Sequence, residues 1–118
     1  MTKRSSDIRL RHMLDHAREA AALAEGNTRQ DLDDDRLLEL ALARLLEIVG
    51  EAASRVPKEE CVEYSEIPWP EIVGLRNRLI HGYDAVDLDI LWQIIVHDLP
   101  PLVTALEAIV ESPAPSET

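Results

Sequence analysis

The chain has 118 residues, of which 46% are hydrophobic, and a formal net charge of −11. This length suits one domain with its own hydrophobic core, and the acidity argues against a protein coated in nucleic acid. Its single cysteine, Cys61, excludes an internal disulfide. There is no apolar run of signal-peptide length and no stretch near the roughly 20 apolar residues of a membrane span. We therefore expect a cytoplasmic protein without membrane contact.

The basic residues are distributed unevenly along the chain. All twelve Lys and Arg lie at or before Arg78, and four of them are Lys3, Arg4, Arg9 and Arg11. A polyanion would therefore be met locally, by the first helix and by the basic residues around Arg76 and Arg78.

Leu, Ala, Glu and Arg dominate the composition, and the four glycines leave few hairpin turns, so we predict an all-α fold. A first helix is expected over about 6–25, where apolar residues recur every three or four positions. A second is expected over about 34–55, after the acidic run 31–35, whose aspartates are suited to capping it. Its apolar face covers about half the circumference, which is typical of a central helix.

Residues 56–70 read as a connection, and Pro70 suits the first turn of a third helix over about 70–81. A fourth helix over about 86–99 is apolar nearly all round, which favours burial against a second copy of the chain. Pro100-Pro101 must break or bend that helix. A last segment over about 102–111 precedes a tail, so we predict one domain over 1–111 and a flexible tail over 112–118.

The third predicted helix carries an unusual polar group, consisting of Arg76, Asn77, His81 and Tyr83. On a helical wheel Arg76 falls in the middle of the apolar arc, where an unpaired charge would cost several kcal/mol. Two solutions remain open. Either Arg76 pairs with a buried carboxylate such as Glu47 or Glu51, or it opens onto a cleft between subunits.

This group suits a metal-free ribonuclease. A guanidinium holds phosphate and stabilises the charge of the transition state, and a histidine transfers protons at neutral pH. A second proton-transfer group would come from a second copy in a dimer. The alternative is structural: Arg76 would be a buried ion-pair arginine, and His81 a histidine favoured by the helix dipole.

Other polar clusters have simpler explanations. Arg44, Glu47 and Glu51 lie on the edge of the second helix, either as ordinary helix pairs or with Arg44 or Glu51 backing the site. His12 and His16 are four residues apart, but both lie off the apolar stripe and no third ligand is evident at a matching spacing. We therefore predict two exposed histidines and no metal site. No cofactor is expected either.

Residues 76–83, Arg-Asn-Arg-Leu-Ile-His-Gly-Tyr, resemble the Arg, four residues, His, any residue, Tyr motif of the HEPN-domain ribonuclease toxins of the HepT family. The similarity extends to residues 45–53, 67–72, 87–92 and 98–100, and covers most of the chain from about 30 to 105.

The resemblance implies a HEPN-type bundle of four to five helices that forms a homodimer or a higher oligomer, with the motif at the interface. It implies a metal-independent endoribonuclease acting on RNA, with Arg76 and His81 catalytic, Asn77 assisting and Arg78 in support. It also implies a toxin whose antitoxin, a nucleotidyltransferase of the MntA type, silences it by attaching AMP to Tyr83. The alternatives are a non-catalytic HEPN substrate of such a nucleotidyltransferase and a purely structural helical dimer.

Overall fold

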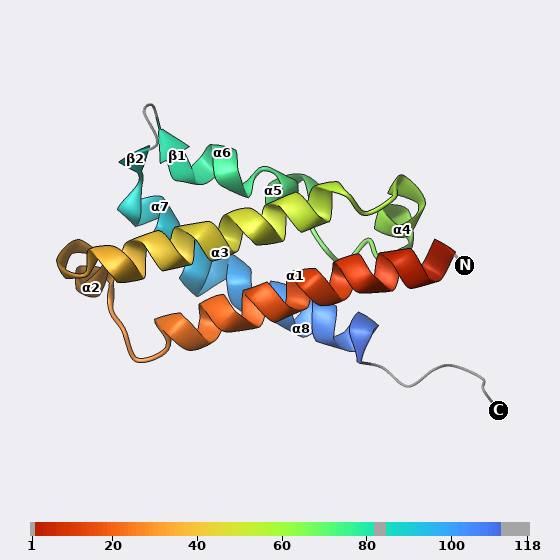
Figure 1. Ribbon diagram of the computed structural model, residues 1–118, viewed down its shortest axis with the longest axis horizontal. Helices are drawn as coiled ribbons and strands as arrows, with labels where there is room; N and C mark the ends of the chain where they lie inside the picture. Colours follow the sequence, from red (N-terminus) through yellow and green to blue (C-terminus); the bar gives the residue numbers. More distant parts are fainter. Residues whose placement is uncertain (1, 82–84, 112–118) are drawn as a thin grey trace.

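The computed structural model describes the backbone of residues 2–81 and 85–111, and the side chains of 8–80 and 85–111. The chain forms an elongated helical bundle of 52 × 29 × 19 Å (Figure 1). The described elements, in chain order, are α1 (Thr2–Ala24), α2 (Arg29–Asp34), α3 (Arg36–Ser54), α4 (Lys58–Glu63), α5 (Trp69–Val73), α6 (Leu75–Leu79), β1 (Ile80–His81), β2 (Ala85–Val86), α7 (Leu88–Gln93), the π-helix η1 (Ile94–Asp98) and α8 (Leu99–Val110). The all-α prediction is confirmed, with one two-stranded hairpin added to it.

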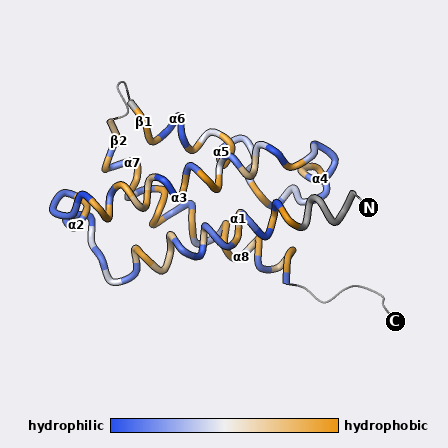
Figure 2. The backbone as a smooth tube through the Cα atoms, viewed as in Figure 1, coloured by the Kyte–Doolittle hydropathy of each residue, from blue (hydrophilic) through white to orange (hydrophobic). Residues whose placement is uncertain are grey.

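The core lies between α1, α3 and α8. The apolar stripe predicted on α1 is buried except at Ala21, and α1 packs against both α3 and α8. Figure 2 shows the alternation of hydrophobic and hydrophilic residues along α1 and α3 that produces these one-sided faces. The completely buried residues of these three helices include Leu10, Met13, Leu14, Ala17, Leu42, Leu46, Val49 and Leu106.

The predicted second helix is central, as expected, because α3 contacts α1, α2, α5, α6 and α7. Its apolar face is not wholly covered, however. Leu37 and Leu40 are 78% and 43% exposed, and Ala41 is also exposed. One side of α3 therefore presents apolar side chains to solvent.

The acidic run 31–35 caps helices, as predicted, but it serves two of them. Asp31 forms a capping box with Thr28 at the start of α2, a short helix that the sequence analysis missed. Asp35 accepts a hydrogen bond from the Leu38 amide and so starts α3 at Arg36, two residues after the predicted start. A second short helix, α4, lies within the predicted connection.

The predicted third helix over 70–81 is wrong as a single helix. It starts at Trp69, one position before Pro70, and breaks at Gly74 into α5 and α6. After Leu79 the chain becomes extended, and Ile80 and His81 pair antiparallel with Val86 and Ala85. The helical wheel drawn through this segment therefore fails, because it assumed an unbroken 3.6-residue period.

The fourth helix was predicted to end at about residue 99, before Pro100 and Pro101. This boundary is wrong, because the helix continues through both prolines to Val110. The helix widens into η1, where the Leu99 amide donates to the Ile94 carbonyl five residues back, and it then continues as α8. Pro100 and Pro101 fall in the first turn of α8, where a missing amide hydrogen is tolerated. In place of the predicted break, the helix has a π-turn directly before the two prolines.

The continuous helix formed by α7, η1 and α8 is relevant to the prediction that the chain makes no membrane contact. Among the described residues, Leu88–Val110 forms a run of 23 residues with mean hydropathy 1.3, long and apolar enough to cross a membrane by length and composition. The core helix of a water-soluble protein meets the same criterion, so the run alone assigns no membrane role. Leu91, Ile94, Ile95 and Leu99 are in fact buried in the bundle, although Val96 is 44% exposed.

Candidate functional site

A groove of about 400 Å³ lies where α3 faces α5 and α6. It contains Arg76 and Asn77 from the predicted motif, together with Arg44 and Glu51, which were predicted as supporting residues. The structure thus brings together four of the predicted site residues from two separated stretches of sequence. The full lining is Arg44, Glu47, Gly50, Glu51, Ser54, Val73, Arg76 and Asn77.

Gly50 sets how closely α3 approaches the motif. A Cβ added at Gly50 would lie 2.9 Å from the Ile72 carbonyl oxygen and 3.6 Å from the Leu75 Cβ. Only a residue without a side chain therefore lets α3 contact the junction between α5 and α6. Because Leu75 is buried there, the adjacent Arg76 is turned outward into the groove.

Glu47 lies between the two arginines of the groove. Its Oε1 is 3.4 Å from Arg44 Nη1 and its Oε2 is 3.7 Å from Arg76 Nε. The Glu47 side chain is 20% exposed, whereas Arg44 and Arg76 are 65% and 61% exposed. One carboxylate therefore orients two guanidinium groups whose surfaces still face solvent, an arrangement that can receive an anion such as phosphate.

The helical wheel placed Arg76 inside the apolar arc, where it could not be a solvated residue. This prediction is wrong, because the helix breaks at Gly74 and the Arg76 side chain on α6 is 61% exposed. Of the two solutions considered, the structure shows the pairing with Glu47. Glu51 instead pairs with Arg55, with Arg55 Nη2 3.2 Å from its Oε2.

Arg78, predicted as a supporting residue, lies elsewhere. Its Nη1 donates to Asp98 Oδ2 at 2.7 Å, so it ties α6 to η1 and does not line the groove. The two arginines of the motif therefore have different positions: Arg76 faces the groove and Arg78 holds the helix that carries it.

The backbone of His81 lies in β1, two residues beyond the end of α6, and the Asp87 amide donates to the Leu79 carbonyl at 2.8 Å at the base of the hairpin. The side chain of His81 and all of Tyr83 lie outside the described residues, as does the predicted tail over 112–118. The hairpin was not predicted, although Gly82 and Asp84 in the connection between the two strands are residue types typical of hairpin turns.

The predicted exposure of His12 is confirmed, whereas His16 is half-buried, and their rings meet edge-on with centroids 4.4 Å apart. No group of three or more His, Cys, Asp or Glu suited to a metal ion occurs within the part of the chain that the structure describes. Burial raises the pKa of the Cys61 thiol above its ordinary value, and the neighbouring Glu60 adds to this effect.

Comparison with known proteins identifies the family. The model of the family described as Ribonuclease HepT-like matches residues 13–109. The chain belongs to the HepT-like ribonuclease family. The comparison with solved structures found no significant match.

Several HepT-like relatives cover most of this chain. The protein of Thermococcus cleftensis named probable ribonuclease HepT is 36% identical over 81% of this chain and 91% of its own length. A candidate RNase of Caldanaerobacter subterraneus subsp. tengcongensis is 35% identical over 86% of this chain and 91% of its own. A candidate RNase of Methanocaldococcus jannaschii is 30% identical over 92% of this chain and all of its own.

The match confirms the family resemblance drawn from residues 76–83, the HEPN-type helical fold and the predicted class of enzyme, a ribonuclease. A HepT-like ribonuclease has RNA as its expected substrate. The roles of individual residues, the oligomeric state and the antitoxin are separate matters.

Proposed function

We propose that this HepT-like chain is a toxin endoribonuclease that cleaves RNA without a metal ion at the groove containing Arg76. The observation that supports this most is the placement of Arg76 and Arg44 around Glu47 in an open groove. In a ribonuclease family, two exposed guanidiniums oriented by one carboxylate suit the binding of a scissile phosphate.

Each motif residue has a chemical role in this proposal. Arg76 holds the phosphate and stabilises the negative charge that grows on its oxygens. Asn77, exposed on the same groove, orients the phosphate or the histidine. His81 transfers protons, because an imidazole changes charge near neutral pH.

The reaction is a transesterification in which the ribose supplies the nucleophile. The 2′-hydroxyl loses its proton to a base and its oxygen bonds to phosphorus, while the bond from phosphorus to the 5′-oxygen breaks. The departing 5′-oxygen gains a proton from an acid. The products are a 2′,3′-cyclic phosphate and a 5′-hydroxyl, and no redox partner is required.

A base and an acid are both needed, and we propose that a second copy of the chain supplies one of them through its own His81. The exposed apolar face of α3 supports such a dimer. Leu37, Leu40 and Ala41 are exposed and lie one to two turns before Arg44 on the same side of the helix. Val73, 44% exposed, lines the groove itself. The dimer contact is thus expected to include α3, in addition to the fourth helix indicated by the sequence.

We further propose that a nucleotidyltransferase antitoxin of the MntA type silences the toxin by attaching AMP to Tyr83. Tyr83 follows His81 by two residues, so the added phosphate and nucleoside would lie beside the catalytic residues. The added negative charge would pair with the groove arginines and exclude the RNA phosphate.

The purified protein should cleave single-stranded RNA in the presence of EDTA and leave 2′,3′-cyclic phosphate ends, as read by mass spectrometry. Arg76→Ala and His81→Ala should both strongly slow the cleavage and relieve the growth inhibition caused by expression, while melting at temperatures close to that of the parent chain. Absence of cleavage together with harmless expression would refute the proposal.

Two other outcomes would support the alternative functions. Modification of Tyr83 by a co-expressed nucleotidyltransferase, with no cleavage by the unmodified chain, would indicate a non-catalytic substrate of that enzyme. Alanine variants that lower only the melting temperature, in a chain without activity, would indicate a structural helical dimer.

A further inference from the structure

A second groove, of about 310 Å³, lies between α1 and α3. It contains Arg9 and His12 from α1 and Arg55 from the end of α3, and its floor is formed by small or aliphatic residues. Its lining is Arg9, His12, Ile48, Glu51, Ala52 and Arg55. Apart from Glu51, none of these residues lines the groove of Arg76.

The two grooves are neighbours because they share one residue. Glu51 lines both of them, so the surface continues from Arg76 and Arg44 across Glu51 to Arg55 and Arg9. We call this continuous surface the α3 track. Arg44 and Arg55 are separated by about 16 Å along the helix axis, which matches about five nucleotides at the stacked spacing of about 3.4 Å per strand.

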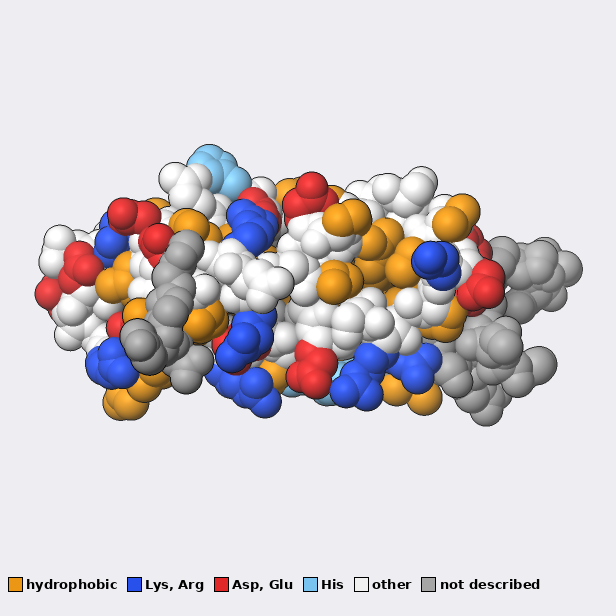
Figure 3. All heavy atoms as spheres, turned by 90° about the horizontal axis from the view of Figure 1, so that it is seen from above, with side chains coloured by type: hydrophobic (Ala, Val, Ile, Leu, Met, Phe, Trp, Pro, Cys, Tyr) orange, Lys and Arg blue, Asp and Glu red, His pale blue; other side chains and the backbone are white. Residues whose placement is uncertain are grey.

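The charge of the α3 track differs from that of the whole protein. Four arginines (Arg9, Arg44, Arg55 and Arg76) line it against two glutamates, whereas the chain carries a net charge of −11. In Figure 3, Lys and Arg side chains gather along one edge of the molecule. A polyanion would therefore be attracted here in preference to the acidic remainder of the surface.

Both glutamates are already engaged by arginines of the track. Glu47 lies between Arg44 and Arg76, and Glu51 lies 3.2 Å from Arg55. Arg55 and Glu51 remain 65% and 59% exposed, so their pairing is loose and a phosphate can share the guanidinium. Arg9 is half-buried in the same groove, and Glu51 is the one acidic residue among the described residues that line it.

We propose that the groove of Arg9, His12 and Arg55 binds the phosphates of the RNA strand that flank the cleavage site. The inference rests on the proposed ribonuclease function and assigns the direction in which the strand leaves the catalytic groove, along α3 toward its C-terminal end. Among the residues that the structure describes, His12 contributes the one ring that lines the track, so we expect the contacts to be mainly to the phosphate backbone and largely independent of sequence. The exposed Leu37 and Leu40 lie toward the other end of α3 and leave this path open.

The test measures binding separately from cleavage. A fluorescein-labelled 2′-O-methyl RNA of about 12 nucleotides keeps every phosphate but cannot undergo transesterification, so fluorescence anisotropy reports binding alone. Arg9→Gln and Arg55→Gln should each weaken binding roughly 3- to 5-fold near 0.1 M salt. Each should also reduce the slope of log K against log salt concentration by about 0.7, the value for one phosphate contact with a single strand.

Arg36→Gln is the matched control. Arg36 is likewise an exposed arginine of α3 that pairs with one glutamate on its own helix, but it lines neither groove. This variant should bind the RNA with the affinity and salt slope of the parent chain. Arg55→Lys should retain most of the salt slope, because it keeps the charge.

The outcomes separate this inference from the catalytic proposal. A double variant Arg9→Gln, Arg55→Gln that binds like the parent chain would overturn the subsite, even if RNA is cleaved. An equal loss of binding in Arg36→Gln would also overturn it, because the effect would then reflect net charge alone. Selective loss of binding by the double variant supports the subsite, even if unmodified RNA is not cleaved and the catalytic proposal fails.

Discussion

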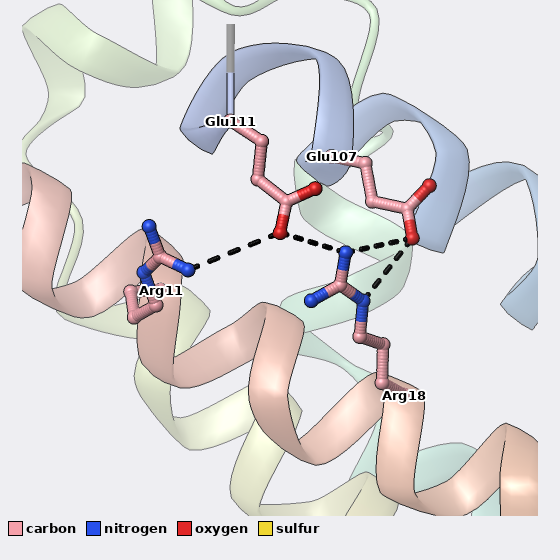
Figure 4. A network of polar contacts seen from close by, with 4 residues as sticks. All are labelled: Arg11, Arg18, Glu107 and Glu111. Carbon is pink, nitrogen blue, oxygen red and sulfur yellow. Dashed lines mark hydrogen bonds and ion pairs between the residues drawn. The ribbon is translucent and has the colours of Figure 1, made fainter.

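Two arginine–glutamate clusters, one between α1 and α8 and the other between α3 and α6, show how similar residues can have different roles. Where α1 faces α8, Arg18 donates from Nε and Nη2 to Glu107 at 3.1 and 2.9 Å and from Nη2 to Glu111 at 2.8 Å (Figure 4). Arg11 lies 4.0 Å from Glu111. The hydrogen bond to Glu111, and to a lesser extent the hydrogen bonds to Glu107, raise the pKa of Arg18. In the groove of Arg76, by contrast, Arg44 and Arg76 share the single carboxylate of Glu47 at 3.4 and 3.7 Å.

The difference lies in charge balance and distance. Two arginines meet two glutamates between α1 and α8, at hydrogen-bonding distance around Arg18, so that cluster joins the two helices. In the groove, two arginines meet Glu47 at longer distances, and Arg76 is 61% exposed against 39% for Arg18. The more exposed guanidiniums of the groove are the ones suited to a ligand, because more of their surface faces solvent.

The largest effect is expected from removing one arginine of each cluster. Arg76→Ala should lower the rate of RNA cleavage roughly 10²- to 10³-fold, the usual cost of losing a donor to the transition state, and should leave the melting temperature nearly unchanged. Arg18→Ala should show the reverse, with unchanged cleavage and a melting temperature lower by about 2 °C. Cleavage assays and thermal melts of both variants provide the check, and equal behaviour of the two would remove the distinction between the clusters.

The second test alters the spacing of the groove and keeps its charges. Gly50→Ala would place a Cβ 2.9 Å from the Ile72 carbonyl oxygen and should destabilise the fold by about 1–3 kcal/mol. It should also slow cleavage, because α6 and Arg76 would move away from Glu47. Gly74→Ala, whose Cβ would lie 3.1 Å from the Pro70 carbonyl oxygen, should have the smaller effect in urea unfolding. An equal or larger effect of Gly74→Ala would contradict the assigned role of Gly50.

A third, smaller effect is expected at the other motif arginine. Arg78→Gln removes the 2.7 Å contact with Asp98, in which both side chains are about a third exposed, and should cost about 0.5–1 kcal/mol of unfolding free energy. Its cleavage rate should fall far less than that of Arg76→Ala. A loss of cleavage as large as that of Arg76→Ala, in a variant that melts like the parent chain, would place Arg78 in the catalytic group instead.

The smallest effect concerns Cys61, which lies outside both clusters. Because burial raises the pKa of its thiol, the folded chain carries less thiolate than the unfolded chain at a given pH. Iodoacetamide should therefore alkylate Cys61 more slowly in the native protein than in urea at pH 8, as followed by mass spectrometry. By the same linkage, stability should decline as the pH rises through the pKa of the unfolded thiol toward that of the folded one, and Cys61→Ser should lack this decline.

The sequence predicted a helix correctly where a single local pattern, such as an apolar stripe or a capping residue, determines it. The stripe of Leu10, Met13 and Leu14 predicted α1, and Asp35 predicted a cap before α3. The prediction failed at 70–81, where Gly74 ends one short helix and the chain turns into a hairpin. It also failed at Pro100, because widening into a π-turn is an option that the rule for proline in an α-helix does not contain.

The site was predicted in part for similar reasons. The residue types of Arg76 and Asn77 pointed to phosphate chemistry, and the edge position of Arg44 and Glu51 on the second predicted helix pointed to a supporting role. Which carboxylate pairs with Arg76 could not be predicted, because Glu47 and Glu51 lie on the same side of α3, one turn apart. The choice depends on how α6 crosses α3.

The sequence by itself determined the helical class, the apolar faces and the polar motif, because each depends on residue identity at a short, regular spacing. Only the tertiary structure decided that Arg76 faces an open groove while Arg78 holds α6 to η1. It also decided that α1 supplies Arg9 and His12 beside Arg55. These results depend on the break at Gly74 and the close approach at Gly50, which together orient elements that lie far apart along the chain.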